Sequence, residues 1–247
     1  MRRALVATPL LSSVLLAAAP AVPLDSARAY KPLNVTIEAT EYRGRKALRV
    51  VEPTLDQGGG IALANGVTFA SGTIEVDLAG APAPVAAEGA RGFIGIAFRV
   101  QADPQRYECF YLRPTNGRAD DQLRRNHATQ YISEPEFPWQ RLRKEQPGVY
   151  ESYVDLEPGA WTHLRIVVDG TRARLYVHDA PQPVLIVNDL KLGDTTGGIA
   201  LWIGQGTEAY FSSLKIAPEP GPVAGTRTTV SERVAWPARS LASQTTR

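Results

Sequence analysis

Short runs of alternating polarity, separated by turn residues, are the feature that most constrains this chain. Thr73–Leu78 alternates polar and apolar residues with the period of two that is typical of a half-buried strand. No apolar period of 3.6 residues persists beyond a turn or two, and 21 Gly and 19 Pro residues supply frequent turns. The pattern predicts about ten to twelve strands and no helix.

Two other runs indicate how the strands pair. Phe93–Val100 is almost continuously apolar, which predicts a central strand covered on both faces. Asp169-Gly170 separates two strand-like runs, which predicts a hairpin. We therefore expect an all-β, two-sheet antiparallel sandwich. The remaining predicted strands are Asn34–Ala39, Ala47–Glu52, Ile61–Leu63, Arg106–Arg113, Pro183–Val187, Gly198–Ile203 and Ala209–Ile216.

The first segment has the build of a secretory signal peptide. A basic start precedes an apolar run that ends near Val22, and Ala27-Arg28-Ala29 offers an A-x-A cleavage pattern. We predict a leader over residues 1–29, a sandwich domain over 30–216, and a linker with a poorly ordered tail over 217–247. The expected location is secreted or periplasmic, with no membrane span in the mature chain.

Charge and cysteine content exclude several classes of function. Cleavage before Tyr30 would leave 24 of the 27 Lys and Arg residues and 24 of the 25 Asp and Glu residues. A formally neutral chain gives no electrostatic support for a nucleic-acid partner. The single cysteine, Cys109, excludes an intramolecular disulfide and a cysteine-built zinc site. We expect this thiol to be a buried, unreactive side chain.

Three segments carry a family resemblance. Ser71–Asp77, Gly159–Gly170 with its Gly-x-Trp start, and Gly197–Trp202 followed by Ala209–Leu214 resemble strands of concanavalin A-like (laminin G-like) domains. The chain looks nearest to the bacterial 3-keto-disaccharide hydrolase and family 16 glycoside hydrolase-like group. The resemblance implies a jelly-roll sandwich, a fold that hosts lectins, enzymes and adhesion modules alike.

The catalytic motif of the glucanases in that family is incomplete here. Those enzymes carry Glu-x-Asp-x-x-Glu on one strand, because retaining hydrolysis needs two nearby carboxyl groups. Glu75 and Asp77 match the first two positions, but Ala79 or Gly80 occupies the third. We therefore assign no catalysis to this strand and expect both carboxylates on a solvated outer face.

A second cluster lies on Arg106–Arg113 and on the long polar stretch from Pro114 to Gly148. Loops of this length are often functional. Aromatic walls with a few polar groups are typical of ligand sites, and this mixture suits a sugar. The predicted ligand-binding residues are Tyr107, Tyr111, Arg113, Asn126, Gln130, Tyr131 and Trp139. The alternative is a strand whose side chains merely support the loop.

The leading hypothesis is an exported, lectin-like protein that binds a carbohydrate on its concave sheet and long loop without catalysis. The alternative is a glycoside hydrolase or lyase of a modified sugar, in which Arg113, His127, Tyr131 and Glu151 would be tested first. A third reading is a cell-envelope interaction module. No cofactor is expected, although Asp120, Asp121 and Asp194 are weak candidates for calcium ligands. The sequence does not indicate the oligomeric state.

Overall fold

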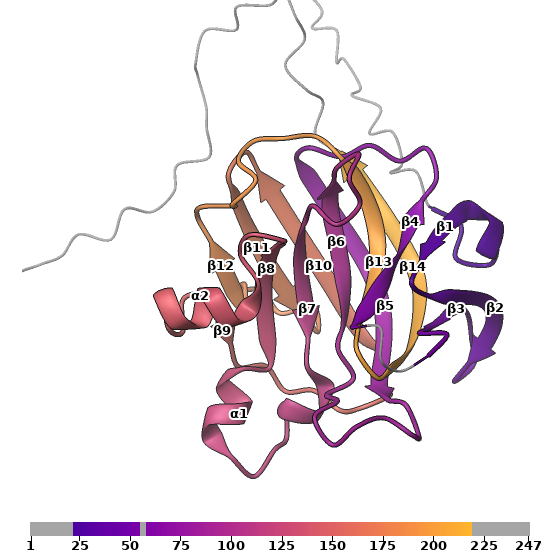
Figure 1. Ribbon diagram of the computed structural model, residues 1–247, viewed down its shortest axis with the longest axis horizontal. Coiled ribbons are helices and arrows are strands. Elements are labelled where there is room, and N and C mark those ends of the chain that lie inside the picture. Colours follow the sequence, from indigo (N-terminus) through magenta and orange to yellow (C-terminus); the bar gives the residue numbers. More distant parts are fainter. Residues whose placement is uncertain (1–21, 55–57, 219–247) are drawn as a thin grey trace, which may run out of the picture.

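Two seven-stranded antiparallel sheets pack face to face in the computed structural model, which describes residues 22–54 and 58–218 (Figure 1). The predicted all-β sandwich is confirmed. In spatial order, the first sheet contains β1 (Tyr30–Leu33), β4 (Gly59–Ala64), β13 (Gly198–Gly204), β6 (Ile94–Val100), β7 (Tyr107–Leu112), β8 (Thr129–Glu134) and β9 (Glu151–Ser152). The second contains β12 (Leu185–Val187), β11 (Arg172–Val177), β10 (Thr162–Asp169), β5 (Gly72–Pro82), β14 (Thr207–Pro218), β3 (Arg45–Val51) and β2 (Thr36–Tyr42).

The core lies between the sheets and is filled by every second residue of each strand. On β5, Ile74, Val76 and Leu78 are at most 1% exposed, whereas the intervening residues face outward. All seven residues of β6 are buried, which confirms a central strand covered on both faces. The predicted hairpin at Asp169-Gly170 joins β10 to β11. Alternation of side chains along each strand thus sets the fold.

The long polar stretch is not the loop that the sequence predicts. It contains a 3-10 turn, η2 (Pro114–Asn116), two short helices, α1 (Gln122–Asn126) and α2 (Trp139–Glu145), and strand β8. Most of β8 is buried although it carries polar residues on both faces. Tertiary partners satisfy these polar groups, so the alternation of hydropathy that marks the other strands is missing here.

A buried pair of opposite charges lies between the sheets. Arg99 is fully buried, and its guanidinium donates to the backbone oxygens of Ala70 and Gly170 at 2.6 to 3.0 Å. The Glu108 carboxylate accepts a hydrogen bond from Leu192 N at 2.7 Å. Burial lowers the pKa of Arg99 and raises that of Glu108, as expected for charges removed from water. These bonds tie three loops to the sandwich.

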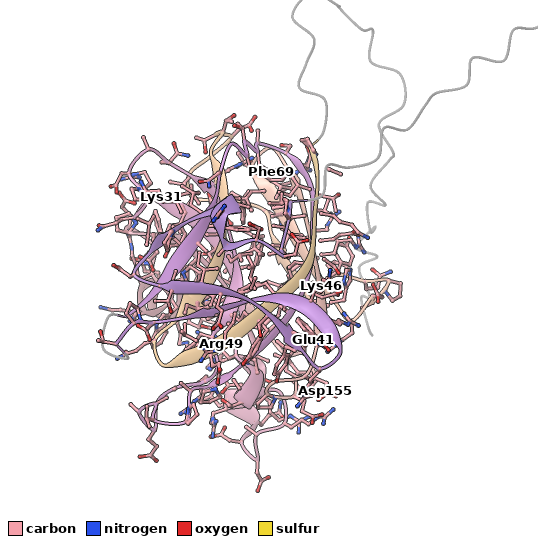
Figure 2. The ribbon with its side chains drawn as sticks, turned by 90° about the vertical axis from the view of Figure 1, so that its right-hand side faces the viewer. Lys31, Glu41, Lys46, Arg49, Phe69 and Asp155 are labelled. Atoms are coloured by element: carbon pink, nitrogen blue, oxygen red, sulfur yellow. The ribbon has the colours of Figure 1, made fainter. Side chains whose placement is uncertain are left out.

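One edge of the second sheet is protected by charge. Figure 2 faces the side of the molecule where β2 ends this sheet, and Glu41 and Lys46 are exposed there. Arg49 bridges to Glu208 across the neighbouring strands at 2.8 Å. Charged side chains on an edge strand discourage pairing with another chain.

Residues 22–29, which the sequence assigns to the leader, pack against the domain. Leu24 is 7% exposed and belongs to the core cluster. Asn65 N donates to Ala29 O at 2.9 Å, just after the short 3-10 turn η1 (Ala27–Ala29). Cleavage before Tyr30 would therefore remove a buried leucine. Within the part of the chain that the structure describes, no helix is long and apolar enough to cross a membrane.

We predict that a chain beginning at Tyr30 is less stable than one beginning at Val22. Full burial of a leucine contributes about 1.5–3 kcal/mol, and the shorter chain loses that contribution. Urea unfolding of both chains measures the difference, and Leu24→Ala in the longer chain should reproduce most of it. Asp25→Ala, a change at an exposed neighbour, is the control. Equal free energies of unfolding would show that the segment adds no stability.

Candidate functional site

The outer face of the first sheet carries two stacked aromatic rings at its centre. Trp202 on β13 and Tyr111 on β7 flank Gly95 on β6 in the strand register. Because Gly95 has no side chain, the two rings meet across it, with centroids 4.7 Å apart and planes 28° apart. A Cβ atom at Gly95 would lie 2.6 Å from Tyr111 Cα, so no other residue fits without a shift.

Two more aromatic rings extend this surface. Phe93 meets Tyr111 edge-on, with centroids 6.1 Å apart. Trp202 Nε1 donates to the hydroxyl of Tyr107 at 3.0 Å. We call Phe93, Tyr107, Tyr111 and Trp202 the aromatic floor. Aromatic rings bury large apolar areas at little entropic cost, which makes such a floor suited to a flat apolar ligand face.

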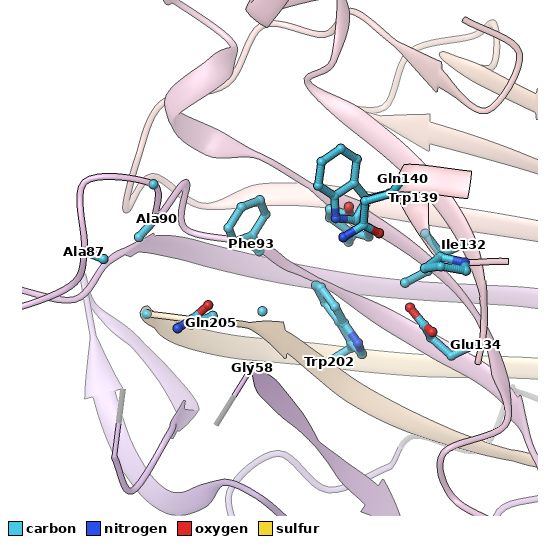
Figure 3. Close-up of a pocket in the computed structure, with 15 residues that line it drawn as sticks. Gly58, Ala87, Ala90, Phe93, Ile132, Glu134, Trp139, Gln140, Trp202 and Gln205 are labelled. Atoms are coloured by element: carbon cyan, nitrogen blue, oxygen red, sulfur yellow. The ribbon is translucent and has the colours of Figure 1, made fainter. Parts of the chain in front are cut away.

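A cavity of about 520 Å³ lies on the aromatic floor (Figure 3). Its walls come from the Ala87–Ala90 segment, from the turn at Gln205-Gly206, and from Trp139 and Gln140 at the start of α2. The buried Glu52 carboxylate holds one wall, because it accepts hydrogen bonds from Gly59 N and Gly206 N, each at 2.6 Å. A cavity of this size falls within the range of small-ligand sites.

Glu134 provides a carboxylate on the wall of this cavity. Figure 3 shows it beside Trp202 and Ile132. Among the described residues, no hydrogen bond or ion pair engages this half-buried carboxylate. Burial, with a smaller contribution from Glu136, raises the pKa of Glu134. An ionisable group that is desolvated and unpaired in a cleft is typical of a functional site.

A second cavity, of about 290 Å³, adjoins the first and shares Phe93 and Trp139 with it. Four guanidinium groups line it, together with Asn116 and His127, and we call it the basic cavity. The four are Arg91, Arg113, Arg124 and Arg143. The Arg143 and Arg113 guanidinium carbons lie 4.6 Å and 5.9 Å from the centre of the Trp139 ring.

Arg113 joins the basic cavity to the aromatic floor. Its side chain is 5% exposed and donates to Tyr111 Oη at 2.8 Å, to Gln130 Oε1 at 2.9 Å and to His127 O at 3.0 Å. Gln130 is itself fully buried and donates to Tyr131 O and Tyr150 O. Burial lowers the pKa of Arg113, and its polar neighbours oppose this effect.

Glu151 is a buried carboxylate beside the basic cavity, where it pairs with Arg143. Arg143 Nε donates to Glu151 Oε1 at 2.8 Å. His127 Nε2 lies 2.9 Å from Glu151 Oε2, but outside hydrogen-bond geometry, so this buried oxygen has no donor among the described residues. Burial lowers the pKa of His127, Glu151 raises it, and Arg143 and Arg113 lower it further. The net effect lowers the pKa of His127 below its usual value, which favours the neutral imidazole.

The structure brings most of the predicted site residues together on this side of the sandwich. Tyr107 and Tyr111 belong to the aromatic floor, and Trp139 separates the two cavities. Arg113, His127 and Glu151 lie together, as the enzyme hypothesis requires. Asn126 lines a further cavity with His127 and Glu151. Gln130 is buried beneath the surface and supports Arg113.

Tyr131 does not lie with these residues, because its side chain points into the core. It is fully buried between the sheets, its hydroxyl bonds the Glu108 carboxylate, and it accepts a hydrogen bond from Lys191 N at 2.8 Å. Strand alternation places Gln130 and Ile132 on the outer face and Tyr131 on the inner one. Tyr131 therefore cannot bind a ligand or take part in catalysis at the outer face.

The other sequence candidates lie elsewhere. Glu75 and Asp77 are on the outer face of the second sheet, where Asp77 pairs with Arg45 and His163 at 2.8 Å. Asp121 caps α1, and Asp194 lies 3.5 Å from Arg99. Over residues 22–54 and 58–218, no three His, Cys, Asp or Glu side chains gather as a metal site. Cys109 is fully buried, and burial raises its pKa.

Several residues of the site are absent from the sequence prediction. They are Arg91, Phe93, Gly95, Asn116, Arg124, Glu134, Arg143 and Trp202. In the sequence, Arg124 and Arg143 belong to the long polar stretch, and Trp202 lies in the predicted strand Gly198–Ile203. Their convergence depends on which strands are neighbours in the sheet, and no local pattern contains that information.

Comparison with known proteins supports the fold. No protein-family model matches the chain, and no curated protein matches its sequence. The carbohydrate-binding module CBM66 of Bacillus subtilis is similar in structure, with a TM-score of 0.53 and 15% identity over 75% of this chain and 93% of that one. A Bacillus subtilis protein of unknown function with a galectin-like fold has a TM-score of 0.56 and 12% identity over 81% and 95% of the two chains. At these identities the likeness shows the fold: a jelly-roll sandwich.

We predict that Glu134→Gln raises the stability of the protein at about pH 7. A carboxyl whose pKa is raised by folding stabilises the folded state below its unfolded pKa, about 4.3, and this contribution is lost as pH rises through the folded pKa. Glutamine stays neutral, so the variant avoids that loss, and the two proteins should converge at about pH 3.5.

Urea unfolding of wild type and variant across this pH range measures the effect. Glu41→Gln, which changes an exposed carboxylate on β2, is the control. A variant that is less stable than the wild type at about pH 7 would mean that the Glu134 carboxylate has a stabilising partner.

Proposed function

We propose that this protein binds a carbohydrate in the cavity on the aromatic floor. The observation that carries the proposal is the stacked pair of Trp202 and Tyr111 beneath a 520 Å³ cavity. Its wall carries Glu134, which has no partner within the described part of the chain. The C–H face of a sugar ring packs on aromatic side chains, and its hydroxyls donate to a carboxylate. The amide of Gln140, which also lines the cavity, adds a donor and an acceptor.

The similar fold of a carbohydrate-binding module is consistent with this role but does not identify the sugar. The resemblance to the 3-keto-disaccharide hydrolase and family 16-like group belongs to the same proposal. So does export, which depends on the basic start and on the small residues that precede Tyr30. An exported protein would meet polysaccharides outside the cell, where a lectin-like module acts.

We predict that Trp202→Ala lowers the affinity for a retained glycan at least tenfold, or about 1.4 kcal/mol. The experiment first screens the protein against a panel of polysaccharides by affinity electrophoresis and then measures the dissociation constant by calorimetry. The matched control is Trp161→Ala, because Trp161 contacts Tyr42 and Arg45 at the second sheet, away from the cavity. Equal losses in both variants, or no retention across the panel, would contradict the proposal.

A second candidate function, catalysis on a glycoside, is favoured by the contact between His127 and Glu151. Two titratable groups within 2.9 Å at the side of a ligand cavity satisfy one requirement of an acid–base site. A neutral imidazole can accept a proton, which is the role of a general base. Glu151 is already engaged by Arg143, so it would orient His127 and hold the positive charge that develops on the ring.

Product release decides between binding and catalysis. If the protein is an enzyme, incubation with the same panel should release new reducing ends or unsaturated sugars, and His127→Ala should lower the turnover number about 100-fold or more. Calorimetry on the same variant separates a loss of turnover from a loss of affinity, because His127 lines the basic cavity but is not part of the aromatic floor. Retention with no product in the wild-type protein would rule out this second function for the panel tested.

A further inference from the structure

The basic cavity contains more positive charge than the carboxylates of residues 22–54 and 58–218 neutralise. We propose that it holds a negatively charged group of the bound glycan, so that the ligand is an acidic sugar. This inference rests on the proposed function, because it concerns a ligand that also lies on the aromatic floor. It adds the chemical class of the ligand, which the floor alone does not specify.

The first argument is the local balance of charge. Several arginines elsewhere on the surface have carboxylate partners: Arg118 pairs with Asp155 and Glu157, and Arg141 with Glu145. Of the four arginines in the basic cavity, Arg143 alone has an ion pair among the described residues, with Glu151. Arg91 donates to backbone oxygens of Glu88 and Ala90 instead. Three guanidinium groups therefore face one small cavity without a carboxylate of their own.

The second argument is the presence of buried polar atoms without partners. Within the described chain, Asn116 Oδ1 and Arg124 Nε are buried and make no hydrogen bond. Asn116 is 5% exposed and lines the cavity, so its oxygen is a buried acceptor at the cavity wall. A buried polar group left unsatisfied costs about 1–3 kcal/mol. An acidic sugar answers both needs, since a hydroxyl donates to Asn116 and an anion accepts from Arg124.

The third argument is the position of Trp139. This ring lines both cavities, and Arg143 and Arg113 lie close to it. A sugar ring packed between Trp139 and the aromatic floor would place a substituent directly in the basic cavity. Guanidinium groups bind carboxylate and sulfate through paired hydrogen bonds, and partial burial strengthens these bonds relative to water. The cavity therefore fits one anionic group attached to a sugar that the floor holds.

The test compares acidic and neutral sugars on the intact protein. The probes are uronic-acid oligosaccharides, the same oligosaccharides with their carboxyl groups reduced to alcohols, and sulfated oligosaccharides of similar length. All calorimetry is run at about 0.15 M salt, so that ionic screening is the same for every probe and non-specific attraction between exposed charges is weakened. We expect one acidic series to bind at least tenfold more tightly than the reduced series. Whichever series binds identifies carboxylate or sulfate as the anion.

The variant that tests the cavity is Arg124→Gln. The described chain gives the Arg124 side chain no hydrogen-bond or ion-pair partner, so its replacement should leave the fold intact. It should lower the affinity for the acidic sugar about tenfold and leave the affinity for the reduced sugar unchanged. Lys144→Gln removes the same charge from an exposed position on α2 that lines neither cavity, and it should change neither affinity.

The outcomes separate this inference from the proposed function. Equal binding of acidic and reduced sugars, abolished by Trp202→Ala, would overturn the inference and leave carbohydrate binding in place. Equal losses in Arg124→Gln and Lys144→Gln would overturn it too, because general surface charge would then explain the preference. Binding of sulfated chains that is insensitive to Trp202→Ala would point to non-specific ion exchange and overturn it. No binding of any probe by the folded protein would contradict both proposals.

Discussion

The candidate site depends on how one buried cation, the guanidinium of Arg113, is satisfied. Removing a charge from water costs several kcal/mol unless acceptors and a counter-charge surround it. Tyr111, Gln130 and the backbone of His127 supply the acceptors. They belong to β7, to β8 and to the end of α1, so satisfying this charge also sets the position of the aromatic floor relative to the basic cavity. The two halves of the site therefore form one unit.

Strands with one or both faces buried in the core were predictable from the sequence. Thr73–Leu78 lies within β5, and Phe93–Val100 contains β6, because burial on one or both faces leaves a direct mark on hydropathy. Strand β8 leaves no such mark. Its Tyr131 is a polar residue of the core whose partner, Glu108, lies on another strand. A sequence pattern cannot reveal that a polar residue is buried when its hydrogen-bond partner comes from elsewhere in the fold.

Part of the site was predictable for the same reason. Alternation places Tyr107 and Tyr111 on one outward face, and residue chemistry points to a sugar. Trp202 was missed because it lies 95 residues from Tyr107, and the position of β13 beside β6 is a property of the topology. Gly95 was missed for a subtler reason. Its role is to have no side chain between two rings, and such a role becomes visible only when both neighbouring strands are known.

The site also concentrates the local inconsistencies of the fold, as functional sites commonly do. Among the residues that the structure describes, Glu134 is desolvated without a partner, Glu151 Oε2 and Asn116 Oδ1 lack donors, and three guanidinium groups lack carboxylates. Each is a cost that the apolar core between the sheets offsets. All of these groups lie around two adjoining cavities, so a single acidic sugar would supply hydroxyl donors and an anion together. Binding would then stabilise the folded state by mass action, because the unfolded chain has no such arrangement of groups.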